Sequence, residues 1–248
     1  MSTSPDPNDQ KNISLPAPSA SRLLTSFTTF LTLTLHTLLY HRHLYPPETF
    51  LTARAYNLPV HQSRHPGVCT WIADAVTAVG AQLRRAAVER VVLAVHAPGQ
   101  FRVLERWVID VARFPEWGSI TGGSAEGANG ADPGGEDDGL VNWTDVNEAL
   151  RGALRRIAYA AEKMAAPPQG CTFTLAVELR DEASAPIGHP QDWIPSQPSL
   201  QPSSKKQAQK QPATVAGPRA TPIRSVQAGP LFFECWVEQP DGDEPKGG

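Results

Sequence analysis

The stretch VVLAVHAPGQFRVLERWVIDV, residues 91–111, predicts a β-hairpin from which the rest of the fold can be built outward. Both halves are strand-like, and in residues 101–111 apolar residues alternate with other residues, the period of two expected of a strand with one buried face. Between the halves, Ala97-Pro98-Gly99-Gln100 places Pro second and Gly third, as a type II turn requires. The second strand carries on one face Phe101, Val103, Trp107, Ile109 and Val111, and on the other Arg102, Arg106 and Asp110.

Amphipathic helices are predicted on both sides of this hairpin. The first begins at Pro66, because Pro favours the first helical position. Its apolar residues at helical spacing are Val68, Ile72, Ala75, Val76, Val79 and Leu83. The second is capped by Asn142 or Thr144, with Asp145 and Glu148 in its first turn. Its apolar stripe is Val146, Leu150, Ala153, Leu154, Ile157 and Ala161.

A further helix is predicted over residues 23–40, which have about the length of a membrane span. Six threonines and His36 interrupt this stretch. Its apolar residues at helical spacing are Leu24, Phe27, Leu31, Leu35 and Leu38, and polar residues fill the opposite side. We therefore predict a half-buried soluble helix and no membrane span. Alternation over residues 31–35 leaves a short strand as the alternative, since β-branched threonines weaken helices.

Three other segments have strand character. Residues 171–179 alternate, with Cys171, Phe173, Leu175, Val177 and Leu179 inward. Residues 231–237, LFFECWV, return to strand character after a long proline-rich stretch, and we expect them to pair at the edge of the same sheet. Residues 50–60 are short and mixed, and they are expected to hold an edge strand that ends at Pro59.

Composition divides the chain into one domain and several loop-like segments. Residues 118–139 hold eight glycines and five acidic residues without a base, which predicts a loop insert. We expect disordered tails at residues 1–21 and 239–248 and one domain over residues 22–238. Residues 181–238 form a long C-terminal arm, in which residues 199–218 are a flexible Lys/Gln/Pro tract.

Charge and motifs exclude several classes of function. The net charge is −3, so no global basic surface indicates a nucleic-acid binder, and any contact with DNA is expected to be indirect. The basic tract over residues 205–224 is either a charge-balanced flexible arm or a contact for DNA phosphates. No phosphate-binding loop or catalytic motif occurs, so the sequence predicts no enzyme and no cofactor, although scattered Ser, His and Asp residues leave an unrecognised site as the alternative.

Histidines and cysteines give no metal site. His61 and His65 have the spacing of half a zinc site, but the second half is missing. The three cysteines, Cys69, Cys171 and Cys235, form no close pair, which also argues against a disulfide framework. We expect surface or capping histidines and, because residues 1–21 lack a signal pattern, an intracellular protein.

Several segments taken in order resemble the HORMA family. They are LLYHRHLYPPETF (38–50), YNLPVHQSRHP (56–66), VERVVLAV (88–95), PPQGCTFTLAVELRDEA (167–183), PIRS (222–225) and LFFECWVE (231–238). Within the family the chain is similar to the non-catalytic accessory subunits of translesion DNA polymerase zeta. The resemblance implies an α+β fold in which three main helices pack on one antiparallel sheet. It also implies that residues 181–238 act as a "safety belt" that closes over a partner peptide, whose backbone extends the sheet.

The resemblance also implies site residues. Tyr45, Trp71, Phe173 and Trp193 match the lining of the peptide site. Trp193 is the strongest candidate, because an indole in a polar, proline-rich arm needs a surface to pack on. The alternatives are an indole packed on the domain without a peptide for Trp193, and ordinary core packing for Trp71 and Phe173.

Further surfaces follow from the same resemblance. Arg151 matches an arginine at the surface through which HORMA domains form homodimers or heterodimers, with a solvated arginine as the alternative. Glu234 and Trp236 lie where the terminal strand would dock the C-terminal domain of a scaffold translesion polymerase. Ala220 and Trp236 depart from the larger aliphatic residue and the tyrosine that the family carries there.

The sequence therefore predicts a nuclear adaptor without chemistry of its own. It would clamp a peptide of the catalytic subunit of DNA polymerase zeta and support translesion synthesis and tolerance of DNA damage. A spindle-checkpoint or meiotic-axis HORMA protein is the alternative within the same fold.

Overall fold

The computed structural model describes residues 15–100, 102–114, 141–181, 183–184, 186 and 219–240. The helices are α1 (Ala17–His41), the short 3-10 helix η2 (Pro47–Thr49), α2 (Pro66–Arg84) and α3 (Trp143–Lys163). The strands are β1 (Phe50–Ala55), β2 (Leu58–Ser63), β3 (Val88–His96), β4 (Val103–Asp110), β5 (Thr172–Leu179), β6 (Arg219–Ala228) and β7 (Leu231–Gln239). The predicted insert at 118–139, the tract at 199–218 and Trp193 lie outside the described residues.

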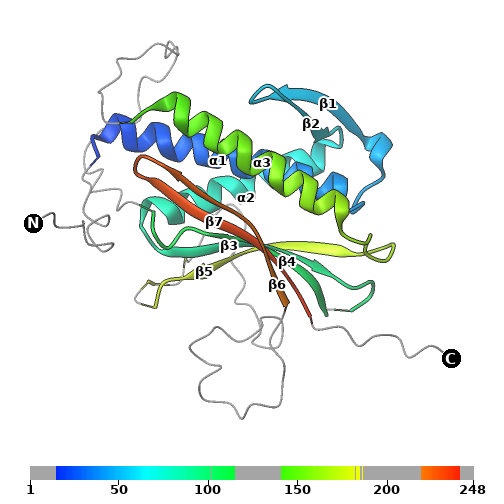
Figure 1. Cartoon of the computed structure of the whole chain (residues 1–248). Coiled ribbons are helices and arrows are strands. Elements are labelled where there is room, and N and C mark those ends of the chain that lie inside the picture. The colour runs from blue at the N-terminus through cyan, green and yellow to red at the C-terminus, as the bar shows by residue number, and fades with distance from the viewer. Residues whose placement is uncertain are drawn as a thin grey trace, which may run out of the picture.

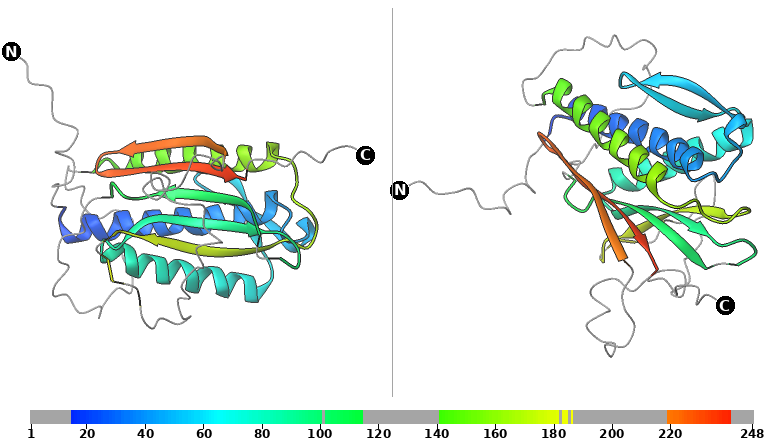
Figure 2. Two further views of the ribbon diagram at one scale, coloured as in Figure 1. Left: turned by 90° about the horizontal axis from the view of Figure 1, so that it is seen from below. Right: turned by 45° about the vertical axis from the view of Figure 1, so that its right-hand side comes forward.

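Five strands form one antiparallel sheet in the order β5-β3-β4-β7-β6 (Figure 1). The three long helices lie on one face of this sheet, and β1 and β2 form a separate two-stranded sheet beside them (Figure 2). The hydrophobic core fills the space between the helices and the large sheet. The predicted α+β architecture of three helices on one antiparallel sheet is confirmed.

Helix α1 packs against α2, α3 and β2, and it is more buried than its sequence pattern predicts. Thr25 and Thr29 are exposed, as expected of a half-buried helix, whereas His36 of the predicted polar side is buried together with Thr34 and Thr37 in the second half. The reason is that neighbouring elements surround this half. The helix is long and apolar enough to cross a membrane, yet 61% of its most apolar window is buried inside the domain.

The start of α1 lies earlier than expected. Pro16 is the N-cap residue, and Pro18 lies in the first turn of the helix, where the missing N–H of a proline is not needed. Residues 17–21, assigned to the N-terminal tail from composition, are therefore helical.

The predicted hairpin of residues 91–111 is confirmed as β3 and β4. Gly99 has a φ of 63°, and the N–H of Gln100 donates to the carbonyl of Ala97 at 3.2 Å, as in a type II turn. The prediction for residues 50–60 is wrong. These residues belong to two strands joined at Tyr56 and Asn57, whose φ angles of 49° and 56° form a tight hairpin turn, and β2 continues through Pro59 to Ser63.

The C-terminal strand β7 pairs with β4, as expected of a strand that returns to the sheet. It is not the edge, because β6 pairs with its other side. The sequence pattern did not predict β6, since this strand is mostly exposed and contains Pro222. A proline is tolerated there because β6 is the outermost strand, where a missing N–H breaks no further pairing.

A buried ion pair joins α1, β4 and α3. Arg42 follows the last residue of α1, and its side chain is 1% exposed. Its Nε donates to Oε2 of Glu105 on β4 at 3.0 Å, and Nε1 of Trp107 donates to the same oxygen at 3.0 Å. The remaining guanidinium nitrogens donate to carbonyl oxygens at the end of α3, those of Ala161, Met164 and Ala165. Sequence patterns missed this pair, although Glu105 stands between Val103 and Trp107 on the inward face.

Replacing Arg42 with methionine is expected to lower the free energy of unfolding by about 3–5 kcal/mol, because Glu105 is left as a buried carboxylate without its cation. Urea denaturation measures the change. Arg84→Met, at the exposed end of α2, is the matched control and should change stability by less than about 1 kcal/mol. The double variant Arg42→Met/Glu105→Met should be more stable than Arg42→Met alone; if it is not, the unpaired carboxylate is not the cause.

The buried His36 predicts a loss of stability in mild acid. Its Nδ1 accepts the N–H of Ser63 at 3.3 Å, and burial lowers the pKa of His36 below its ordinary value. The unfolded chain takes up a proton near pH ~6.5, whereas the folded chain resists it, so the stabilisation present above that pH is lost as the pH falls toward the folded pKa. His36→Asn keeps an acceptor that does not titrate.

Thermal unfolding between pH ~7.5 and pH ~5.5 tests this expectation. The melting temperature of His36→Asn should fall less over this range than that of the unsubstituted protein. The exposed His43 supplies the control, because His43→Asn also removes one histidine but leaves His36 and its bond to Ser63 in place. Equal pH dependence in all three proteins would contradict the role of His36.

Candidate partner-binding site at the edge of β5

Strand β5 ends the five-stranded sheet, with β3 on one side. Residues of an antiparallel strand alternate between those whose backbone groups face the partner strand and those whose groups face away. The N–H of Arg180 donates to the carbonyl of Ala87 at 2.9 Å, so every second residue back from Arg180 also faces β3. The residues that face away are Phe173, Leu175 and Val177. No strand of the described residues pairs with them, so this edge can accept an added strand.

Three aromatic side chains meet at the start of this edge. Tyr45 follows the C-terminal end of α1, Trp71 lies on α2, and Phe173 is the second residue of β5. The ring of Trp71 stands perpendicular to that of Phe173 at 5.2 Å between centroids, and Tyr45 meets Phe173 edge-on at 6.1 Å. All three are partly buried against the core, so each keeps surface for a further apolar contact.

The structure therefore brings three of the four predicted peptide-site residues together. The fourth, Trp193, is outside the described residues. Sequence reasoning missed Leu175 and Val177 as edge residues, because alternation shows which side chains point inward but not which backbone groups lack a partner strand. Sequence patterns also could not show that the rings of Tyr45 and Trp71 contact Phe173, because the three residues lie far apart in the sequence.

The histidines have structural roles among the described residues. Nδ1 of His65 accepts the N–H of Val68 at 3.4 Å and so caps α2, as the sequence predicted for capping histidines. The ring of His61 stacks on Tyr40 at 3.5 Å between centroids. Within the described ranges no cluster of three His, Cys, Asp or Glu side chains is arranged to hold a metal ion.

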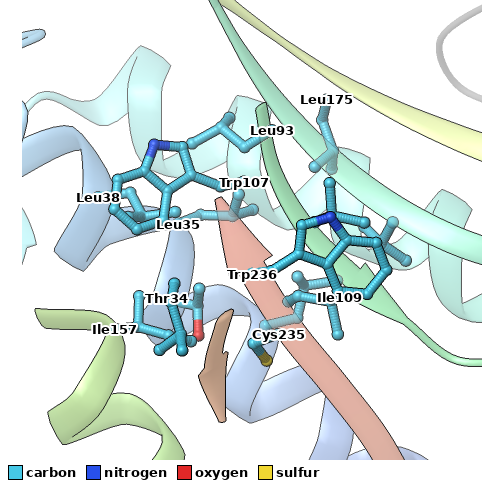
Figure 3. A pocket seen from close by; sticks show the side chains of 14 residues that line it. Thr34, Leu35, Leu38, Leu93, Trp107, Ile109, Ile157, Leu175, Cys235 and Trp236 are labelled. Carbon is cyan, nitrogen blue, oxygen red and sulfur yellow. The ribbon is translucent and has the colours of Figure 1, made fainter. Parts of the chain in front are cut away.

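A small cavity lies between α1, α3 and the sheet (Figure 3). Its volume of about 20 Å³ is enough for about one water molecule. Figure 3 places Trp107, Leu35 and Leu38 beside it, and Thr34 is among its lining residues. Oγ1 of Thr34 is buried without a hydrogen-bond partner in the part of the chain that the structure describes. The size and apolar lining indicate a packing defect of the core and not a ligand site.

The other predicted surfaces are placed as follows. Arg151 lies on α3, half exposed, and forms an ion pair with Glu148 one turn earlier. Glu234 is exposed on β7, and Trp236 is on the same face, where its Nε1 donates to Oε1 of Glu238 at 2.8 Å. Arg90 covers the ring of Trp236 at 5.8 Å. This face points away from the helices, while docking and dimerisation through these residues stay predictions.

The HORMA domain pattern matches residues 24–229 of the chain. The chain belongs to the HORMA domain family. The protein of Schizosaccharomyces pombe named DNA polymerase zeta processivity subunit is 30% identical over 223 residues, which cover 89% of this chain and 94% of that protein. The human mitotic spindle assembly checkpoint protein MAD2B is 26% identical over 215 residues, which cover 85% and 87%.

Solved HORMA structures share the fold. A chain of the mitotic checkpoint complex has a TM-score of 0.63 at 16% identity and covers 90% of this chain and 99% of its own length. HTP-2 of C. elegans bound to the HIM-3 closure motif has a TM-score of 0.59 at 12% identity, with 92% of each chain covered. At these identities the likeness establishes the arrangement of helices and strands alone.

Backbone hydrogen exchange tests the open edge of this HORMA domain. The amides of Thr174, Ala176 and Glu178 face β3 and should be protected by pairing. Those of Leu175 and Val177 should exchange faster in the free chain by at least about tenfold. Residue-resolved NMR measures both sets. Equal protection of the two sets would show that another segment already pairs with this edge.

Proposed function

We propose that this HORMA protein is the non-catalytic accessory subunit of DNA polymerase zeta. It binds an extended peptide of the catalytic subunit along the edge of β5 and supports translesion synthesis and tolerance of DNA damage in the nucleus. The observation that carries the peptide-binding part of the proposal is the open edge of β5 next to the aromatic cluster of Tyr45, Trp71 and Phe173.

The geometry supports peptide binding in two ways. A peptide strand beside β5 can exchange backbone hydrogen bonds with Phe173, Leu175 and Val177, which gives affinity without sequence preference. The aromatic cluster then selects a proline or another apolar side chain by shape. Residues 181–238 are long enough to enclose such a peptide, which would slow its dissociation.

The assignment to polymerase zeta is supported by relatives and not by the site geometry. The 30% identity over 94% of the S. pombe processivity subunit supports this branch of the family. A spindle-checkpoint or meiotic-axis adaptor is the second candidate, since MAD2B relatives and HTP-2 with a closure motif share the fold. The second candidate would use the same edge with a different peptide.

Binding of a fluorescent peptide from the proline-rich segment of the same organism's polymerase zeta catalytic subunit tests the proposal. We expect slow dissociation from the unsubstituted protein. Phe173→Ala and Trp193→Ala should each weaken binding by at least about tenfold, because both aromatic rings are proposed anchors. Trp236→Ala, on the other face of the sheet, is the matched control and should bind as the unsubstituted protein does.

The same titration separates the two candidates. A closure-motif peptide from a checkpoint or meiotic protein of that organism should bind weakly if the polymerase assignment holds. Tight binding of that peptide, with no binding of the polymerase peptide at micromolar protein, would favour the second candidate. Protection of the Leu175 and Val177 amides by the bound peptide would locate it on the edge of β5.

A further inference from the structure

A second open strand edge lies on the other sheet of the molecule, against an unused pocket. The pocket has a volume of about 320 Å³ and lies between the C-terminal half of α1, strand β2 and helix α3. Leu58, Val60 and Leu154 make up much of its apolar wall. His41, His61 and Arg155 supply its titratable and charged groups. The volume lies within the range of ordinary ligand pockets.

Pairing with β1 fixes which backbone groups of β2 face this pocket. The N–H of Arg64 donates to the carbonyl of Thr49 at 2.8 Å, so every second residue back from Arg64 faces β1. Ser63, His61 and Pro59 therefore face away from β1. The N–H of Ser63 confirms this direction, since it donates to Nδ1 of His36 on α1.

Both backbone groups of Ser63 on that side already have partners. Its N–H donates to His36, and its carbonyl accepts a hydrogen bond from Sγ of Cys69 at 3.1 Å. The N–H and carbonyl of His61 and the carbonyl of Pro59 are left facing the pocket. No strand of the described residues pairs with this side of β2. One extended residue beside His61 would exchange two hydrogen bonds with it, as in an antiparallel ladder.

The charge of the pocket indicates what side chain such a segment carries. The described lining contains the cation Arg155 and two histidines but no acidic residue. Arg155 is exposed and belongs to none of the ion pairs found in the described part of the chain. A carboxylate is the complement of an unpaired arginine, and the apolar wall fits a neighbouring aliphatic side chain.

We propose that the edge of β2 and this pocket form a second docking site, which receives an extended acidic segment of a partner protein. The segment adds a short strand to β2, directs a carboxylate to Arg155 and places an aliphatic side chain against Leu58 and Leu154. This site is separate from the edge of β5, because β2 belongs to the two-stranded sheet (Figure 1). The chain can then hold two partner segments at once.

The histidines add a pH response. Burial lowers the pKa of His61. The pKa of His41 is also lowered, mainly by burial and to a smaller extent by the neighbouring His61 ring. His43 and Arg42 also act against protonation of His41, whereas Glu162 on α3 favours it. A bound carboxylate favours the protonated rings, so affinity for an acidic segment rises as the pH falls below about 6.5, the ordinary pKa of histidine.

An NMR titration of the full chain with the peptide acetyl-Thr-Val-Glu-Val-Glu-Val-Thr-amide tests the proposal. We expect saturable shifts of the His61, Leu154 and Arg155 amides, and tighter binding at the lower pH. Arg155→Glu should weaken binding by about tenfold. Arg156→Glu, the next exposed arginine of α3, carries the same charge change outside the pocket and should alter binding less than about twofold.

Two further peptides separate strand pairing from simple charge attraction. Methylation of the central valine nitrogen should abolish binding, because that position can then no longer donate to β2. Replacement of both glutamates by lysine should also abolish binding, because the lysine side chains repel Arg155. Equal losses for Arg155→Glu and Arg156→Glu, or shifts confined to Leu175 and Val177, would overturn the proposal. So would shifts of the Arg155 amide on dilution without peptide, which would indicate that a second copy of the chain occupies the pocket.

Discussion

The buried contact between Arg42 and Glu105 connects the parts of the molecule on which the candidate site depends. Arg42 ends α1, Glu105 lies on β4, and the arginine also binds the last carbonyl groups of α3. Those carbonyl groups have no partner within their own helix, so Arg42 acts as a cap supplied by another element. One side chain thus aligns the C-terminal ends of two parallel helices above the sheet.

This alignment has a direct consequence for binding. Tyr45 follows Arg42 by three residues, and its ring reaches Phe173 at the start of β5. Trp71 approaches the same ring from α2, which His65 caps. The aromatic cluster therefore forms where the ends of α1, α2 and β5 converge. A partner bound there would contact Trp71 and Phe173, which lie on a helix and a strand packed against the core, and such preorganisation limits the entropy lost on binding.

Open strand edges are the second organising feature. Edges invite aggregation, and proteins usually cover or shorten them. In the described part of the chain β5 and β2 each keep an edge beside a helix, with aromatic rings at one and an arginine with two histidines at the other. At the far end of the large sheet, the outermost strand β6 contains Pro222, and a proline on an edge strand disfavours pairing with a further strand. An adaptor of the kind we propose can use such edges to join partner segments.

The sequence by itself determined the local elements and the family. The period of two in residues 101–111 and 171–179, the Pro98-Gly99 turn, the proline at the start of α2 and the cap of α3 at Asn142 or Thr144 are read from neighbouring residues; the strands, the turn and the proline are present, and Asn142 is the cap. Only the tertiary structure decided how deeply α1 is buried, how Arg42 meets Glu105 across 63 positions, and which strand edges are open. Periodicity reports which face of an element is apolar. It carries no information on how many other elements surround that face, or on which backbone groups find a partner strand far away in the sequence.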